Sequence, residues 1–179
     1  VDECQRMIAA DRSFIHERLG TLVFGEDDET LEAATLQLLE QQQGTVATLE
    51  GGTSGLLAQT LAIAAAGRSN FKAGSVIAAC DLLPNEVLPA GSSSAISSEA
   101  AVQMAKWIRS QQGTDFGLAV THFSAVKNEG DISMCFIALA TANDVEVVEH
   151  RILSDASIAR PRATKTAINM LRLRLLANG

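Results

Sequence analysis

The chain has 179 residues, of which 47% are hydrophobic, so it is long enough to fold as one domain around a substantial core. Its net charge of −7 and pI near 4.9 argue against a nucleic-acid partner, which needs a basic surface. No apolar stretch is long enough to cross a bilayer, and the three widely spaced Cys residues suggest neither a metal site nor a disulfide framework. We therefore expect a cytoplasmic protein that contacts no nucleic acid and no membrane and uses no metal ion or cofactor.

Hydrophobic periodicity and turn residues predict helices that alternate with strands along the chain. The predicted helices cover residues 2–18, 27–43, 53–66, 98–112 (capped by Ser97) and 157–177, and the predicted strands cover 45–49, 71–79, 116–121, 132–140 and 145–153. A short extended piece is expected at 21–24, a flexible serine loop at 91–94, and a hairpin connection at 141–144. Pro161 fits the last helix only if it lies in the first turn. This alternation predicts a three-layer α/β/α domain, and the late hairpin predicts a mixed sheet.

The most informative segment is a glycine-rich elbow between a predicted strand and a predicted helix. Its sequence is Glu50-Gly51-Gly52-Thr53-Ser54-Gly55. The N–H groups of residues 52–55 should be free at the helix start, where they could bind an anionic ligand. No Lys follows the glycines, so the elbow is not a phosphate-binding P-loop, and the glycine spacing is not the dinucleotide-binding one. A simpler interpretation, in which the glycines only let strand and helix pack closely, remains open.

Several polar residues near this elbow are candidates for ligand binding. They are Glu50, Gly51, Gly52, Thr53 and Ser54 in the elbow, with Thr121 and His122 after the third strand. Ser54 is expected to cap the helix, whereas Glu50 either holds the helix N-terminus electrostatically or acts in catalysis. A Cys80–His122 pair, with Asp81 nearby, is a conceivable nucleophile and base, because both lie past the carboxyl ends of predicted strands.

Five segments together resemble one known family, the C-terminal domain of the CinA (competence/damage-inducible) proteins. The segments are Gly-Glu-Asp-Asp-Glu-Thr-Leu at 25–31, Thr48 through Leu57, Phe71 with Gly74, Ile-Ser-Ser-Glu at 96–99, and Gly-Leu-Ala-Val-Thr at 117–121. The resemblance implies an anticodon-binding-domain-like α/β/α fold with a mixed five-stranded sheet, and a homodimer. Active family members are nicotinamide-nucleotide amidohydrolases of pyridine nucleotide salvage.

The chain departs from that family at the catalytic positions. Active members have a serine nucleophile where this chain has Gly51, a cysteine at Gly52, and a tyrosine and a lysine at the positions of Ala78 and Leu83. Covalent amide hydrolysis needs a nucleophile and a base, which these residues cannot supply. We therefore assign no catalytic residue.

Two functions follow from the resemblance and the departures. The first is a catalytically inactive CinA-type module that serves a larger protein by binding or dimerisation and still recognises a pyridine mononucleotide or another anionic small molecule. The alternative is an active amidohydrolase with rearranged catalytic residues, which converts nicotinamide mononucleotide and water to nicotinate mononucleotide and ammonia. Residues 1–24 are expected to be the tail of an upstream module, with N-terminal domains of the same polypeptide as partners, and residues 25–179 the CinA-like domain.

Overall fold

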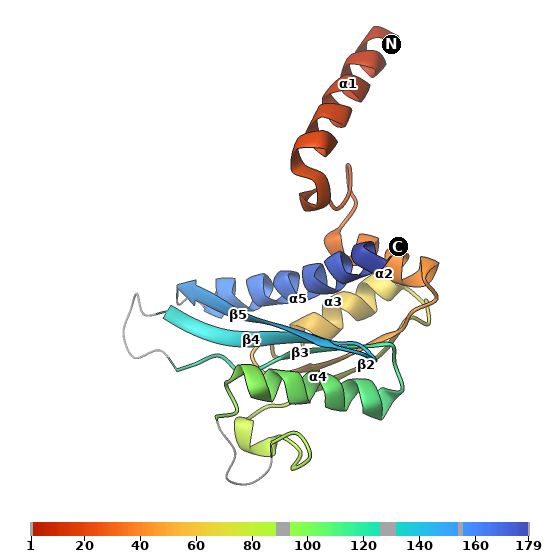
Figure 1. Ribbon diagram of the computed structural model, residues 1–179. Coiled ribbons are helices and arrows are strands. Elements are labelled where there is room, and N and C mark those ends of the chain that lie inside the picture. Colours follow the sequence, from red (N-terminus) through yellow and green to blue (C-terminus); the bar gives the residue numbers. More distant parts are fainter. Residues whose placement is uncertain (1, 89–93, 126–131, 154–155, 179) are drawn as a thin grey trace.

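A computed structural model of the protein describes residues 2–88, 94–125, 132–153 and 156–178 (Figure 1). Its elements are α1 (Asp2–Leu19), η1 (Gly20–Leu22), α2 (Leu31–Gln41), β1 (Val46–Glu50), α3 (Leu56–Ala65), β2 (Phe71–Val76), η2 (Cys80–Leu82), α4 (Ser98–Gln112), β3 (Phe116–Val120), β4 (Ile132–Ala140), β5 (Val145–Leu153) and α5 (Ala156–Asn178). The serine loop expected at 91–94 lies almost wholly outside the described residues. No helix in the described ranges has the length and apolar character that a membrane crossing requires.

The five strands form one mixed sheet in the order β2-β1-β3-β4-β5, as predicted. β1 runs parallel to both β2 and β3, whereas β4 is antiparallel to β3 and to β5. The predicted hairpin joins β4 to β5, and the Thr141 N–H donates to the carbonyl of Asp144 across it at 2.9 Å. The parallel core therefore lies at one side of the sheet and the hairpin at the other.

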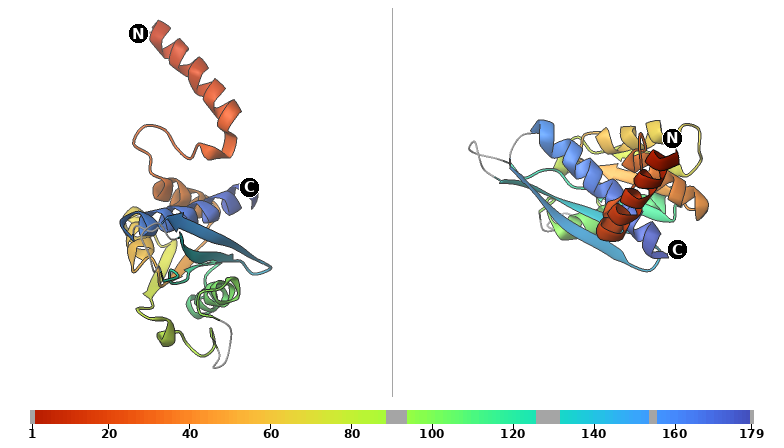
Figure 2. Two further views of the ribbon diagram at one scale, coloured as in Figure 1. Left: turned by 90° about the vertical axis from the view of Figure 1, so that its left-hand side faces the viewer. Right: turned by 90° about the horizontal axis from the view of Figure 1, so that it is seen from above.

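Helices cover both faces of the sheet, which confirms the three-layer α/β/α architecture. α2, α3 and α5 lie on one face and α4 on the other (Figures 1 and 2). All five residues of β1 and all five of β3 are buried, as expected for strands covered on both sides. Gly117 lets α4 approach β3, because a Cβ at this position would lie 2.1 Å from the carbonyl oxygen of Ala105.

The N-terminal helix stands away from this body (Figure 1). We call residues 2–24 the arm. The extended piece predicted at 21–24 is wrong for its first two residues: Gly20–Leu22 forms a 3₁₀ turn, in which the Val23 N–H donates to the carbonyl of Gly20 at 3.1 Å, and Val23 is extended. The arm is tied to the body by Arg172 of α5, which is only 3% exposed and whose guanidinium donates to the carbonyl of Thr21. Burial lowers the pKa of Arg172. That residues 1–24 are the tail of an upstream module stays a prediction.

The end of the second strand and the place of Pro161 both differ from the prediction, for physical reasons. β2 ends at Val76 rather than at residue 79, because its partner β1 ends at Glu50, which pairs in register with Val76. Pro161 lies in the second turn of α5, not the first, and the helix continues through it. The apolar face of α5, including Ile168 and Leu171, is fully buried against the sheet and stabilises the helix despite the missing amide hydrogen.

Candidate functional site

The glycine-rich elbow lies at the carboxyl end of β1 and first continues the pairing with β3. The Gly51 N–H donates to the carbonyl of Val120 at 2.9 Å, and the Gly52 N–H donates to the carbonyl of Thr121 at 3.1 Å. The chain then turns through left-handed conformations at Ser54 (φ 53°) and Gly55 (φ 95°), so α3 starts at residue 56 rather than at 53. The Ser54 N–H donates to the carbonyl of Gly51. The expectation of free amides at 52–55 is therefore wrong for Gly52 and Ser54.

The carboxylate of Glu50 satisfies the start of α3. Glu50 is completely buried; its Oε1 accepts from the Ala58 N–H at 2.9 Å and its Oε2 from the Leu57 N–H at 3.1 Å. The Thr53 hydroxyl, itself only 1% exposed, donates to the same Oε2. A negative charge at a helix N-terminus is favourable, and charge-assisted hydrogen bonds strengthen it. The carboxylate thus takes the place that a bound anion would occupy.

Ser54 does not cap α3, contrary to expectation. The N-cap residue is Gly55, and the Ser54 hydroxyl donates to the carbonyl of Gly51 at 3.4 Å. Capping by Glu50 comes from the preceding strand, because the tight turn brings its side chain back over the first turn of α3.

The side chain of His122 occupies the space beside Gly51. A Cβ added to Gly51 would lie 2.5 Å from both Cε1 and Nδ1 of that imidazole, well inside van der Waals contact. A Cβ added to Gly52 would lie 2.8 Å from Cδ2 of Phe123 and 2.8 Å from the carbonyl oxygen of Thr121. The two glycines therefore make room for two consecutive side chains of this same chain.

Thr121 fixes the backbone that carries these side chains. It is fully buried, and its hydroxyl accepts from the Phe136 N–H at 3.0 Å and donates to the carbonyl of His122 at 3.1 Å. The Nε2 atom of His122 is buried and has no hydrogen-bond partner among the described residues. The imidazole is therefore held by packing against the elbow rather than by a polar network.

The other positions singled out from the sequence do not join the elbow as a polar site. Ala78 is exposed after the end of β2, and Leu83, 8% exposed, belongs to the apolar core on the α4 side. Cys80 is half-buried in η2, and no hydrogen bond links it to His122 within the described parts of the chain. The structure thus brings Glu50, Thr53, Thr121 and His122 together with the glycines and leaves the cysteine hypothesis without a supporting contact.

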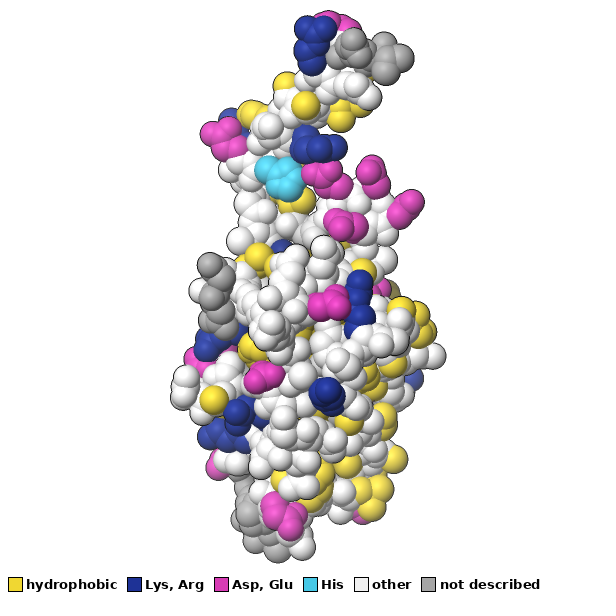
Figure 3. Space-filling model, turned by 90° about the vertical axis from the view of Figure 1, so that its right-hand side faces the viewer, with side chains coloured by type: hydrophobic (Ala, Val, Ile, Leu, Met, Phe, Trp, Pro, Cys, Tyr) yellow, Lys and Arg dark blue, Asp and Glu magenta, His cyan; other side chains and the backbone are white. Residues whose placement is uncertain are grey.

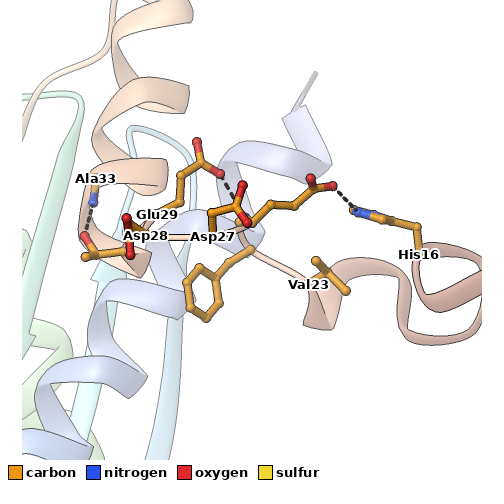
Figure 4. Close-up of a pocket in the computed structure, with 10 residues that line it drawn as sticks. His16, Val23, Asp27, Asp28, Glu29 and Ala33 are labelled. Atoms are coloured by element: carbon orange, nitrogen blue, oxygen red, sulfur yellow. Dashed lines mark hydrogen bonds and ion pairs between the residues drawn. The ribbon is translucent and has the colours of Figure 1, made fainter. Parts of the chain in front are cut away.

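A second feature was missed by the sequence analysis. An open hollow of about 870 Å³ lies between the arm and the start of α2 and is lined by four consecutive carboxylates, residues 26–29, together with His16 and Val23 (Figure 4). Glu26 bridges two residues of α1, accepting from Arg12 Nε and meeting His16 Nε2, both at 3.1 Å. The helix predicted to start at residue 27 starts instead at Leu31, so the acidic residues 27–29 precede it. In the structure Thr30 caps α2 by accepting from the Ala33 N–H at 3.3 Å.

Comparisons with known proteins agree with this architecture. The family described as the CinA C-terminal domain matches residues 28–175. A CinA-like protein of Acidobacterium capsulatum is 30% identical over 92% of this chain and 41% of its own length, and one of Dictyoglomus thermophilum is 28% identical over 98% and 44%. The chain therefore spans less than half the length of these relatives.

Solved structures show the same fold. A CinA superfamily protein from Klebsiella pneumoniae has a TM-score of 0.73 at 20% identity, covering 82% of this chain and 96% of that one. A counterpart from Escherichia coli has a TM-score of 0.69 at 21% identity, with 87% and 98% covered. The family match extends over most of the chain and includes the whole sheet and the elbow, so the chain belongs to the CinA C-terminal domain family.

Proposed function

We propose that this chain is a non-catalytic CinA-type module that acts by association within a larger cytoplasmic protein. The observation that carries the proposal is the contact between the imidazole of His122 and Gly51. Position 51 is the one at which, by the resemblance, active members have the nucleophilic serine. Glycine has no oxygen or sulfur with which to attack an amide, and a Cβ at 51 could be accommodated only if the ring moved. The imidazole of His122 thus fills the space that a serine side chain at position 51 would need.

The other polar groups of the elbow serve the fold. The Glu50 carboxylate is engaged by two amides of α3 and by the Thr53 hydroxyl, and Thr121 holds β3 to β4. A residual oxyanion site without a nucleophile gives only weak catalysis. Nothing in this arrangement favours the alternative, an amidohydrolase with relocated catalytic residues.

Nucleotide recognition at the elbow is disfavoured by the same contacts. A phosphate that approached the N-terminus of α3 would meet the buried carboxylate of Glu50, which already accepts from Leu57 and Ala58. Two like charges in one poorly solvated place repel each other. We therefore favour association over ligand binding as the role of the module.

The test of the proposal is ammonia release from nicotinamide mononucleotide by the purified chain. We expect no turnover, whereas a rate of about 1 per second, ordinary for an enzyme, would overturn the proposal. Calorimetric titration with nicotinamide and nicotinate mononucleotides tests the ligand separately, with Thr53→Val as the control. A dissociation constant of about 1 μM, equivalent to about −8 kcal/mol, would show that the elbow still binds the nucleotide if Thr53→Val raises that constant.

A further inference from the structure

A small polar pocket lies at the opposite end of β1 from the elbow. Its volume is about 240 Å³, and its walls come from the ends of α2 and α3 and from the residues that precede β1 and β2. Both helix ends lie on the right-hand side of Figure 1, which faces the viewer in Figure 3, and acidic and basic side chains adjoin each other on this largely polar face. Sites for drug-sized ligands measure about 300–1,000 Å³, so this pocket suits a smaller molecule.

The amide side chain of Asn70 borders the pocket and lacks one hydrogen-bond partner. Asn70 is only 6% exposed, and its Nδ2 donates to the carbonyl of Leu36 in α2 at 2.8 Å. This bond fixes the orientation of the amide, because a flipped amide would set two acceptors against each other. The Oδ1 atom is buried and accepts from no residue that the structure describes. A buried acceptor without a donor is unfavourable, so Asn70 calls for an N–H group from outside the chain.

An ion pair in the wall of the same pocket leaves several of its atoms available. Arg68 Nε lies 3.1 Å from Oε2 of Glu40, and the two side chains are 37% and 58% exposed. In the described part of the chain, the terminal NH₂ groups of Arg68 and the Oε1 atom of Glu40 have no further partner. A guanidinium binds a carboxylate through two N–H groups, and a carboxylate oxygen accepts from an ammonium group. The pair therefore offers a positive and a negative group side by side.

The backbone around the pocket favours a positively charged group beside Asn70 and Glu40. The carboxyl ends of α2 and α3 both lie here, and the negative end of a helix dipole attracts a cation. The side chains of Gln43 and Ser69 also line the pocket, are exposed, and form no hydrogen bond with the residues described. The mouth of the pocket is therefore polar.

We propose that this pocket binds a free α-amino acid. The ammonium group is held by Oδ1 of Asn70 and Oε1 of Glu40, and the carboxylate accepts from the terminal NH₂ groups of Arg68. An α-amino acid carries both charged groups on one carbon, so it matches two opposite charges in the wall of one small pocket. Gln43 and Ser69 are left to contact a polar side chain of the ligand. This function goes beyond the association role proposed above and lies away from the elbow, where a nucleotide is disfavoured.

Titration of the ¹⁵N-labelled full chain, followed by NMR, tests the inference. Glycine, L-serine and L-glutamine are the probes. At least one should shift the side-chain amide of Asn70 and the backbone amides of Gln43 and Ser69 in a saturable way, with a dissociation constant of about 1 mM or lower. Methylammonium and acetate each carry one charged group of glycine, so each should bind about tenfold more weakly than the best amino acid, or worse.

Two single variants test the charged contacts. Arg68→Gln and Glu40→Gln should each raise the dissociation constant of the amino acid about tenfold or more, because each leaves one charged group of the ligand unpaired. Both side chains are partly or largely exposed, so neither variant should unfold the chain. The matched controls are Arg151→Gln and Glu149→Gln, which alter another ion pair on β5, at the other edge of the sheet, and should leave the affinity unchanged.

The opposite results overturn the inference. If none of the three amino acids gives a saturable shift up to about 10 mM, the pocket binds no amino acid. Acetate that binds as tightly as the best amino acid would show a simple anion site at Arg68, and shifts confined to residues 51–55 would place the ligand at the elbow. The ammonia assay is independent of these results: an active chain that binds an amino acid overturns only the non-catalytic function.

Discussion

Restoring a side chain at position 51 should destabilise the fold by a predictable amount. In Gly51→Ala the new Cβ would lie 2.5 Å from two ring atoms of His122, so the imidazole must shift or turn outward. Overpacking of this kind costs about 1–3 kcal/mol, and we expect about 2 because the ring is half-buried and has some freedom to move. Gly51 has no positive φ, so the backbone itself adds no strain.

A double-mutant cycle separates this contact from other effects. Urea unfolding would be measured for Gly51→Ala, His122→Ala and the double variant. Because His122→Ala removes the ring that the new Cβ meets, the double variant should be more stable than the sum of the single effects by about 1 kcal/mol or more. Gly51→Ala combined with His150→Ala, on the distant strand β5, should be additive within about 0.5 kcal/mol. An unchanged stability of Gly51→Ala, or additivity with His122→Ala, would refute the packing argument.

Three further outcomes are expected. Glu50→Gln replaces a charged acceptor of two helix amides by a neutral amide that accepts through one oxygen only. Thermal or urea unfolding should therefore show that the free energy of unfolding falls by about 1.5–3 kcal/mol. An unchanged midpoint would contradict the capping role. Burial lowers the pKa of His150 below its usual 6.5, so its contribution to stability is present above pH 6.5 and is lost as the pH falls. His150→Gln should therefore make the loss of stability toward acid pH less steep. The same slope of stability against pH in the variant and in the unmodified chain would contradict this. Deleting residues 1–20 should leave the monomer's unfolding free energy within about 0.5 kcal/mol of the full chain's. Deleting residues 1–24 should cost about 1–3 kcal/mol more, because buried Arg172 loses its carbonyl acceptor, and equal stability of the two truncated chains would refute that link.

The sequence predicted most of the fold because local signals and tertiary packing agree there. The alternating pattern of the two long antiparallel strands and the turn residues between them placed both strands with their observed bounds, Ile132–Ala140 and Val145–Leu153. The Ser97 cap of α4 was also confirmed, its hydroxyl accepting from the Ala100 N–H at 3.1 Å. Such features depend on neighbours within a few residues.

The candidate site was predicted less well because its contacts join segments far apart in sequence. The glycines of the elbow were located, but nothing local showed that His122 and Phe123, about 70 residues away, would fill the space beside them. Ser54 fits the statistics of a helix cap, yet left-handed backbone at 54 and 55 moved the helix start and let Glu50 take that role. The acidic hollow was missed for the same reason, since one wall comes from α1 and the other from the segment before α2.

A long incubation of nicotinamide mononucleotide with the full chain at high protein concentration, followed by proton NMR of the pyridine ring, shows directly whether the elbow retains any catalysis. We expect the nicotinamide resonances to persist unchanged, because position 51 has no nucleophile and His122 occupies the space beside it. Stoichiometric or greater conversion to nicotinate mononucleotide, abolished by His122→Ala, would contradict it and would show that the imidazole belongs to a working catalytic site.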